Sequence, residues 1–356
     1  MIYVTKTYLP PFEEYCNEIR GLWESSTVSN MGPEHEAFAG ALEKYLGVRH
    51  VSLFANGHLA LEAVLRALDL PSGSEVVTTP LTFPSTVNAI IRCGLVPVFA
   101  DVLASDGTMD PASAEKLAGP RTSAILPVQV YGNVCDDEAL RALASTRGLR
   151  LVYDAAHAFG VRYRGVSALA LGDASAVSFH ATKVFSTAEG GAVCFGDDGL
   201  VQRLIDEKNF GIRGYENCVG AGGNGKMNEL QAAMGICNLR HLDEVLQERR
   251  RLYELYRELL PEVRFLEPRE GVEPNWAYVP AVFKNRDAVY DRLMEAGVMA
   301  RKYFYPPVNE LPYCREYRGC TPVASAISQG ILCLPLYPGL APEEVEKICS
   351  VIKFCS

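Results

Sequence analysis

Asp154 and Lys183 have the residue types and the setting for cofactor chemistry. Asp154 ends the apolar segment 151–153, and Lys183 follows a second apolar segment, 174–179, with the two residues 29 positions apart in the sequence. In an open α/β sheet, ligands bind beyond the carboxyl ends of the strands. Each residue also has a plainer explanation, because Asp154 could cap the next helix and Lys183 could be a solvated surface lysine. Taken together, however, they match the needs of one reaction type.

That reaction type is chemistry on pyridoxal 5′-phosphate (PLP). A lysine must hold this cofactor as a Schiff base, release it to the substrate amine and then move a proton. A carboxylate must keep the pyridine nitrogen protonated, so that the ring can accept electrons. We therefore predict that Lys183 is the catalytic lysine and that Asp154 pairs with the pyridine nitrogen.

Six further residues could complete such a site. Asn56-Gly57-His58 leads directly into a predicted helix, whose N-terminus would favour a phosphate, and Ser178 could add a hydroxyl. Phe83 could stack on one face of the ring, and His157 could cover the other face or bond the ring hydroxyl. The loop could also be an ordinary strand–helix turn, and both rings could simply be packed.

The elements that must position these residues alternate along the chain. Short apolar segments predict strands at 51–54, 75–79, 96–100, 124–130, 151–153, 174–179 and 191–195. Helical spacing of apolar residues predicts helices at 38–46, 59–70, 85–93, 111–117 and 136–145. This alternation favours an α/β fold with a mainly parallel sheet covered on both faces.

The chain divides into three predicted parts. Residues 1–30 form an irregular N-terminal segment, 31–240 a large cofactor-binding domain, and 241–356 a smaller C-terminal α/β domain. The stretch 198–258 is predicted to be helical. Strands at 276–283 and 331–334, with helices at 287–296 and 342–352, are predicted for the small domain.

Composition excludes several classes of function. The 34 Lys and Arg against 43 Asp and Glu give a net charge of −9 without a basic block, which argues against nucleic acid and anionic membranes as partners. No apolar run is long enough for a membrane span, and the N-terminus lacks the pattern of a signal peptide. The eleven cysteines include no Cys-x-x-Cys pair, so we expect reduced thiols, no metal site and a cytoplasmic location.

The ordered motifs resemble the nucleotide-sugar aminotransferases of the DegT/DnrJ/EryC1/StrS family, a branch of PLP fold type I. The resemblance covers nearly the whole chain. The segments that carry it are 56–61 (NGHLAL), 82–89 (TFPSTVNA), 97–102 (PVFADV), 130–132 (VYG), 154–158 (DAAHA), 178–183 (SFHATK), 189–191 (EGG), 226–233 (KMNELQAA) and 334–337 (LPLY). Each is short, but their order and spacing together are specific.

The resemblance implies a large, mainly parallel seven-stranded sheet and a role for several residues. The lysine at position 183 would carry PLP, Asp154 would pair with the pyridine nitrogen, and Phe83 would stack on the ring. Asn224 would reach the phosphate bound by a neighbouring subunit, which implies a homodimer with shared active sites. A dehydratase branch has His where this chain has Lys183, so transamination is favoured.

Two positions depart from the usual pattern of the family. Many members have Ser-Gly-Thr where this chain has Asn56-Gly57-His58, so a threonine hydroxyl to the phosphate is lost and His58 could replace it. Many members also have Gln where this chain has His157, whose protonation would influence the ring oxygen O3′.

The motifs look closest to those of enzymes that aminate C4 of dTDP-4-keto-6-deoxyglucose with L-glutamate as donor. A UDP-linked or a 3-keto sugar nucleotide is the alternative acceptor. Lys6 and Arg213 are candidates for the diphosphate, and Tyr215 and Tyr305 for the sugar or base. A PLP-binding protein with a regulatory role would have the same motifs, whereas a dinucleotide-dependent oxidoreductase lacks support because no Gly-x-Gly-x-x-Gly occurs at a strand–helix turn.

Overall fold

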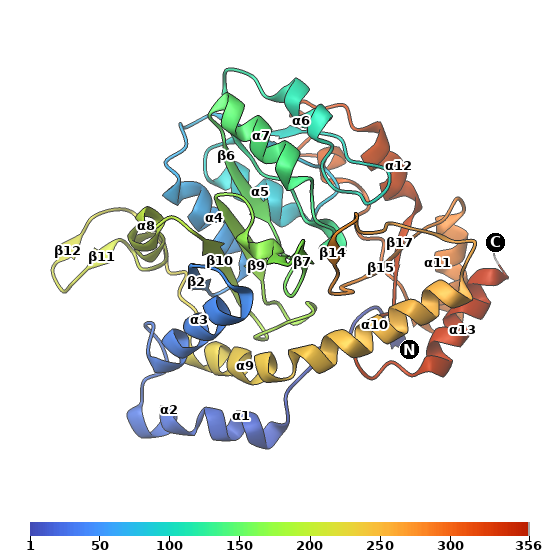
Figure 1. Ribbon diagram of the computed structural model, residues 1–356, viewed down its shortest axis with the longest axis horizontal. Helices are drawn as coiled ribbons and strands as arrows, with labels where there is room; N and C mark the ends of the chain where they lie inside the picture. Colours follow the sequence, from blue (N-terminus) through green and yellow to red (C-terminus); the bar gives the residue numbers. More distant parts are fainter. Residues whose placement is uncertain (355–356) are drawn as a thin grey trace.

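A seven-stranded sheet forms the centre of the molecule. The computed structural model describes residues 1–354 of the chain (Figure 1). The strand order is β2-β10-β9-β6-β5-β3-β4. The strands are β2 (His50–Phe54), β3 (Glu75–Thr78), β4 (Val96–Phe99), β5 (Thr122–Ile125), β6 (Arg150–Asp154), β9 (Ala174–Ser178) and β10 (Gly191–Phe195). Neighbouring strands from β9 to β4 are parallel, and β10 is antiparallel to both β2 and β9.

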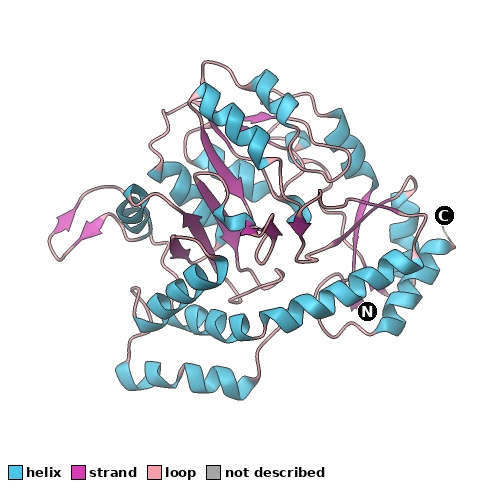
Figure 2. Cartoon of the chain, viewed as in Figure 1, coloured by secondary structure: helices cyan, strands magenta, loops and turns pink. Residues whose placement is uncertain are grey.

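Helices cover both faces of this sheet, as Figure 2 shows in cyan against the magenta strands. One apolar core lies under α3 (Pro33–Leu46), α6 (Pro111–Leu117), α7 (Asp137–Arg147) and α9 (Glu229–Arg240). A second core lies under α4 (Gly57–Ala67), α5 (Pro84–Arg92) and α8 (Gly199–Lys208). The fully buried strand β10 consists of apolar or small residues because it faces protein on both sides. The predicted mainly parallel α/β fold is therefore confirmed.

A third core lies in the C-terminal part of the chain, between two layers. One layer is the small sheet of β13 (Arg264–Phe265), β15 (Val279–Val282) and β17 (Ile331–Leu334). The other consists of α10 (Leu242–Leu259), α11 (Arg286–Glu295) and α13 (Pro342–Lys353). The N-terminal strand β1 (Ile2–Tyr3) pairs in parallel with β16 (Val298–Met299), and Ile2 is buried in this same core.

The remaining elements are short. They are α1 (Phe12–Glu18), α2 (Arg20–Ser25), β7 (Arg162–Tyr163), β8 (Val166–Ser167), β11 (Ile212–Arg213), β12 (Asn217–Cys218), β14 (Val272–Glu273), α12 (Pro322–Gly330) and the 3₁₀ turns η1 (Val130–Gly132), η2 (Ala168–Ala170) and η3 (Val308–Glu310). No helix within residues 1–354 is long and apolar enough to cross a bilayer.

Two predicted elements were wrong, and one helix was missed. The stretch 198–258 is not continuously helical, because β11 and β12 form a hairpin that projects from the body of the molecule at the left of Figure 1. The strand predicted at 124–130 ends at Ile125, and Val130 begins a 3₁₀ turn. Helix α12 was not predicted. Its nine residues are too few for a clear helical periodicity, and several of them are buried.

Candidate active site

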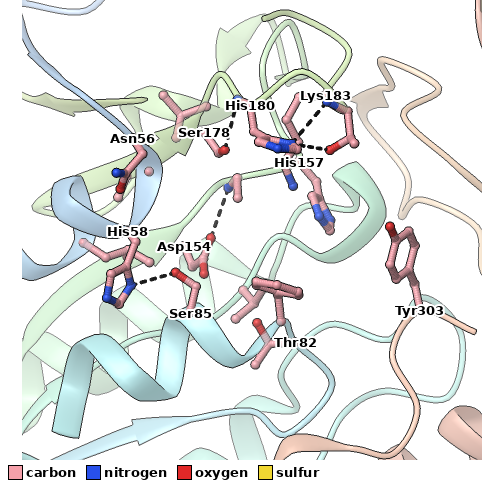
Figure 3. A pocket seen from close by; sticks show the side chains of 18 of the residues that line it. Asn56, His58, Thr82, Ser85, Asp154, His157, Ser178, His180, Lys183 and Tyr303 are labelled. Atoms are coloured by element: carbon pink, nitrogen blue, oxygen red, sulfur yellow. Dashed lines mark hydrogen bonds between the residues drawn. The ribbon is translucent and has the colours of Figure 1, made fainter. Parts of the chain in front are cut away.

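One cavity of about 630 Å³ lies at the carboxyl ends of the central strands. Asp154 is the last residue of β6 and Ser178 the last of β9, and both line the cavity. The wall on the other side comes from the C-terminal part of the chain and includes Tyr278 and Tyr303. In Figure 3, Asn56 and His58 lie on one side and Tyr303 on the other, with Asp154 between them. The cavity therefore lies where ligands bind in open α/β sheets.

Asp154 is a buried carboxylate with two hydrogen-bond donors. The Thr86 hydroxyl donates to its Oδ2 at 2.6 Å, and the backbone N–H of Ala156 donates to its Oδ1 at 3.1 Å. Burial raises the pKa of Asp154, while these two hydrogen bonds lower it. Thr86 in turn accepts from the Thr82 hydroxyl at 2.7 Å, because its own proton points at the carboxylate. The pocket thus contains an acceptor suited to a protonated ring nitrogen.

Lys183 lies in the same cavity, in the loop that follows β9. The turn that holds it is closed by a hydrogen bond from its backbone N–H to the carbonyl of His180, at 2.9 Å. Burial lowers the pKa of the Lys183 ammonium to about 8, although the nearby Asp154 carboxylate raises it. The solvated surface lysine that the sequence left open is therefore wrong. A pKa of about 8 leaves part of the amine neutral, and so nucleophilic, at neutral pH.

His157 is buried beside these two residues and is neutral. Burial lowers its pKa well below the usual value, and the charge of Lys183 lowers it further. Its Nδ1 accepts from the backbone N–H of Tyr131 at 3.0 Å, so the proton is assigned to Nε2, which lies 3.2 Å from the Tyr278 hydroxyl. The ring is also stacked on that of Phe304, with centroids 6.0 Å apart.

The N-terminus of α4 opens onto the cavity. Asn56 caps this helix by accepting from the backbone N–H of Leu59 at 2.9 Å. Gly57 is the first residue of the helix, and a Cβ there would lie 2.8 Å from Cβ of Ser178, so only glycine allows the two segments to touch. Free N–H groups of the first helical turn and the positive end of the helix dipole form an anion site here.

His58 is held between two side chains at this helix start. Its Nδ1 lies 2.9 Å from Oγ of Ser85, and its Nε2 lies 3.1 Å from the buried Glu62, which also pairs with Arg92. The imidazole therefore lines the cavity at the position where many members of the family that the motifs resemble have threonine.

Phe83 is the N-terminal flanking residue of α5, lines the cavity and is 60% exposed. An exposed aromatic side chain in a pocket is available for stacking on a planar ligand. All eight cofactor contacts predicted within a single chain thus line one cavity. They are Asn56, Gly57, His58, Phe83, Asp154, His157, Ser178 and Lys183.

The other predicted residues do not line this cavity. Arg213 and Tyr215 lie on the β11–β12 hairpin, where Arg213 pairs with Asp206 at 2.6 Å and Tyr215 is fully exposed. Asn224 is exposed in the segment that returns from the hairpin and bridges to Asn209. Lys6 is exposed near the N-terminus, and the ring of Tyr305 is covered by the guanidinium of Arg286 at 4.4 Å.

Several pocket residues were missed from the sequence. Thr82 and Ser85 lie within the motif 82–89 but were given no role, and His180 and Glu189 lie within two others. Tyr278, Arg301, Tyr303 and Phe304 come from the C-terminal part of the chain. No group of His, Cys, Asp and Glu side chains within residues 1–354 is arranged to hold a metal ion.

Comparisons with known proteins identify the family to which the chain belongs. The model of the DegT/DnrJ/EryC1/StrS aminotransferase family matches residues 12–353. The chain belongs to this family. It is 36% identical to the dTDP-4-amino-4,6-dideoxy-D-glucose transaminase of Shigella dysenteriae, over 99% of the chain and 98% of that protein. The transaminase of the same name from Escherichia coli is 34% identical, over 98% and 97%. The crystal structure of DesI in the presence of its TDP-sugar product superposes with a TM-score of 0.94, at 32% identity over 99% and 92%.

The protein is therefore a PLP-dependent sugar-nucleotide aminotransferase of fold type I. The residues of its pocket fit this cofactor. The helix start at Asn56-Gly57 offers the donors that a phosphate needs, and Asp154 offers the carboxylate that a pyridinium needs. Lys183 offers an amine with a lowered pKa in the same cavity. The family uses a nucleotide-linked keto sugar and an amino donor.

Proposed function

We propose that this aminotransferase moves the amino group of L-glutamate to C4 of dTDP-4-keto-6-deoxyglucose. The observation that carries the proposal is the full-length similarity to two transaminases named for dTDP-4-amino-4,6-dideoxy-D-glucose, at 36% and 34% identity. Lys183 is also the one lysine among the described residues that line the cavity, so one amine would serve as the acid–base group for both substrates in turn. We further propose a cytoplasmic location, as the sequence predicts.

The roles of the pocket residues follow from their chemistry. PLP, when bound, supplies an electron sink that makes the proton beside the transferred nitrogen acidic. Asp154 keeps the ring nitrogen protonated, and the hydroxyl of Thr86 keeps Asp154 in place. Asn56, Gly57, His58 and Ser178 hold the phosphate at the start of α4.

Lys183 is the proton carrier in both halves of the reaction. Its lowered pKa makes the amine a competent base near neutral pH. In the first half Nζ would take the proton from the α-carbon of glutamate and pass it to C4′ of the cofactor. In the second half it would take a proton from C4′ and pass it to C4 of the sugar. Phe83, at one face of the pocket, stacks against the ring, and His157 bounds another side with its neutral imidazole.

We also propose that two copies of the chain form a homodimer that shares its active sites. The β11–β12 hairpin projects from the body of the molecule (Figure 1), and exposed Phe210, Ile212 and Tyr215 lie on or beside it. These apolar side chains need a partner surface, since exposed apolar patches on an isolated chain are unfavourable. Asn224, Arg213 and Tyr215 would then complete the pocket of the partner.

The test uses the holoenzyme with L-glutamate and a panel of keto-sugar nucleotides. The panel contains dTDP-, UDP- and GDP-linked sugars with the keto group at C3 or C4, and the amino product is identified by NMR. We expect 2-oxoglutarate and the 4-amino dTDP sugar. Amination of only a UDP-linked or 3-keto sugar would contradict the substrate, and failure of glutamate to convert the cofactor to its amine form would contradict the donor. Lys183→Ala is the control, and it should lose both the absorbance of the lysine-bound cofactor and turnover.

A further inference from the structure

Arg301 is a cation in the pocket wall without an acidic partner. It is the single arginine among the described residues that line the cavity. Its guanidinium lies 5.7 Å from the centre of the Tyr303 ring, and no Asp or Glu oxygen within residues 1–354 comes within 4.0 Å of it. The side chain is exposed. A guanidinium held on an aromatic face with its N–H groups free is well suited to bind an anion.

The other charged groups of the pocket already have partners or functions. Glu62 lies 3.1 Å from Nε2 of His58, and Glu189 lies 3.6 Å from Nε2 of His180. Lys183 is committed to the cofactor in the proposed function. Arg301 therefore provides a permanent positive charge in the pocket that is available to bind an anionic group of a substrate.

The backbone of Arg301 is fixed, although its side chain is not. Its N–H donates to the carbonyl of Cys333 at 3.0 Å, and the N–H of Cys333 donates back at 2.8 Å, which ties residue 301 to the edge of β17. The guanidinium lies over the ring of Tyr303. An anchored Cα with a long, unpaired side chain can meet anions at different depths of one cavity.

We infer that Arg301 is the anion contact shared by both substrates. This inference rests on the proposed function, in which the donor and the sugar nucleotide occupy the same cavity in turn. The donor carries carboxylates and the acceptor carries a diphosphate, and a guanidinium binds both groups with paired N–H donors. Arg301 holds a carboxylate of the donor in the first half of the reaction and the diphosphate in the second.

The test compares wild-type holoenzyme with Arg301→Gln and Arg301→Lys. Binding of glutarate, which has the carboxylates of glutamate but no amine, is measured by calorimetry. Binding of dTDP, UDP and GDP is measured in the same way, and the nucleotide that the wild type binds tightest is used for the comparison. For Arg301→Gln we expect both dissociation constants to rise about 10- to 100-fold, as for loss of charge-assisted hydrogen bonds, with a smaller rise for Arg301→Lys. The same rise should appear in the KM for glutamate, with a smaller change in kcat.

Arg250→Gln is the matched control. The guanidinium of Arg250 also lies 5.7 Å from an aromatic ring, that of Trp276, and Arg250 does not line the cavity, so its removal should leave both constants unchanged. Unchanged binding in Arg301→Gln, or weakening for glutarate or nucleotide alone, would overturn the shared role. Failure of the proposed function looks different, because the wild type would then not convert its cofactor with glutamate at all.

Discussion

The hydroxyl of Thr86 donates to the Asp154 carboxylate at 2.6 Å, across 68 residues of sequence. This bond lowers the pKa of a carboxyl group that burial raises. Thr82 donates to Thr86 in turn, so the two hydroxyl groups form a hydrogen-bonded chain that ends at the carboxylate. Asp154 must be ionised to pair with a protonated ring nitrogen, and the threonine therefore supports the charge state on which the proposed chemistry depends.

Thr86→Val should move the acidic limb of the pH–rate profile to higher pH. Valine keeps the shape of threonine but removes the donor, so the pKa of Asp154 rises and the carboxylate is lost at a higher pH than in the wild type. Loss of a hydrogen bond to a charged group corresponds to about 1.5–3 kcal/mol. The measurement is kcat/KM for the glutamate half-reaction between pH 5 and 9.

Thr86→Ser is the control, because serine keeps the hydroxyl and should keep the wild-type profile. A Thr86→Val profile that superimposes on that of the wild type would show that this bond does not govern the ionisation of Asp154.

Uptake of PLP by the apoenzyme should become faster as pH rises through about 8. The pKa of Lys183 is lowered to about 8, and only the neutral amine can react with the cofactor aldehyde. Below this pH the ammonium dominates and uptake slows. The measurement is the rate at which the absorbance of the bound cofactor appears after mixing.

Asp154→Asn should shift this pH dependence of uptake to lower pH. The Asp154 carboxylate raises the pKa of Lys183, so its removal lowers the pH at which the amine becomes neutral. An unchanged or opposite shift would contradict the electrostatic coupling of the two residues.

The pair Asp154 and Lys183 could be predicted from the sequence, whereas the residues that contact this pair could not. Asp154 ends β6 and Lys183 follows β9 within a few residues, and strands that end in polar residues are recognisable from local sequence. Thr86 lies on α5, and only the order of the strands brings that helix beside β6. Its contact with Asp154 has no signature in either segment.

Arg301 and the β11–β12 hairpin escaped prediction for a related reason. The strand β16 before Arg301 has two residues, and so have β11 and β12, which is too short for any periodicity. A charged residue after such a segment resembles a solvated surface residue until the small domain is folded against the pocket. The long elements of the large domain, by contrast, had clear apolar spacing.

His157→Gln should be tolerated better than His157→Ala. The imidazole accepts from the N–H of Tyr131 and faces the hydroxyl of Tyr278, and a glutamine amide can accept at its oxygen and donate at its nitrogen. Alanine would leave a buried donor unsatisfied, which costs about 1–3 kcal/mol before any cavity is counted. The measurement is the free energy of unfolding of the apoenzyme in urea.

The wild type and both His157 variants are compared at the same pH, above the lowered pKa of His157, so that the imidazole is neutral throughout. Equal destabilisation by glutamine and alanine would contradict the role given to the two hydrogen bonds.

Mixing two inactive variants should restore activity if the active sites are shared. Lys183→Ala removes the amine from one pocket, whereas Asn224→Ala removes a side chain proposed to serve the pocket of the partner. A mixed dimer would contain one pocket with both residues intact, so refolding the two variants together should recover about a quarter of the wild-type rate by random pairing of subunits. No recovery, with dimers demonstrated by light scattering, would contradict the assignment of Asn224 to the partner's site.

Lys208→Met should stabilise the protein relative to the wild type more at pH 7 than at pH 10. The Lys208 ammonium is buried, which lowers its pKa to about 8, and the charge of Lys226 lowers it further. Because the folded pKa lies below the unfolded value, the wild type is stabilised by Lys208 at high pH and loses this contribution as pH falls from about 10.5 to about 8.

Methionine carries no such pH-dependent term, although it loses the hydrogen bonds of Lys208 to Ser52 and to the Leu53 carbonyl at 3.1 and 3.0 Å. The stability difference between variant and wild type should therefore change by up to about 3 kcal/mol across this range, since one pKa unit corresponds to about 1.4 kcal/mol. Urea unfolding at both pH values measures it. Lys44→Met, at an exposed position on α3, is the control and should show no such change. A difference that is the same at pH 7 and pH 10 would mean that Lys208 does not become neutral in the folded protein over this range.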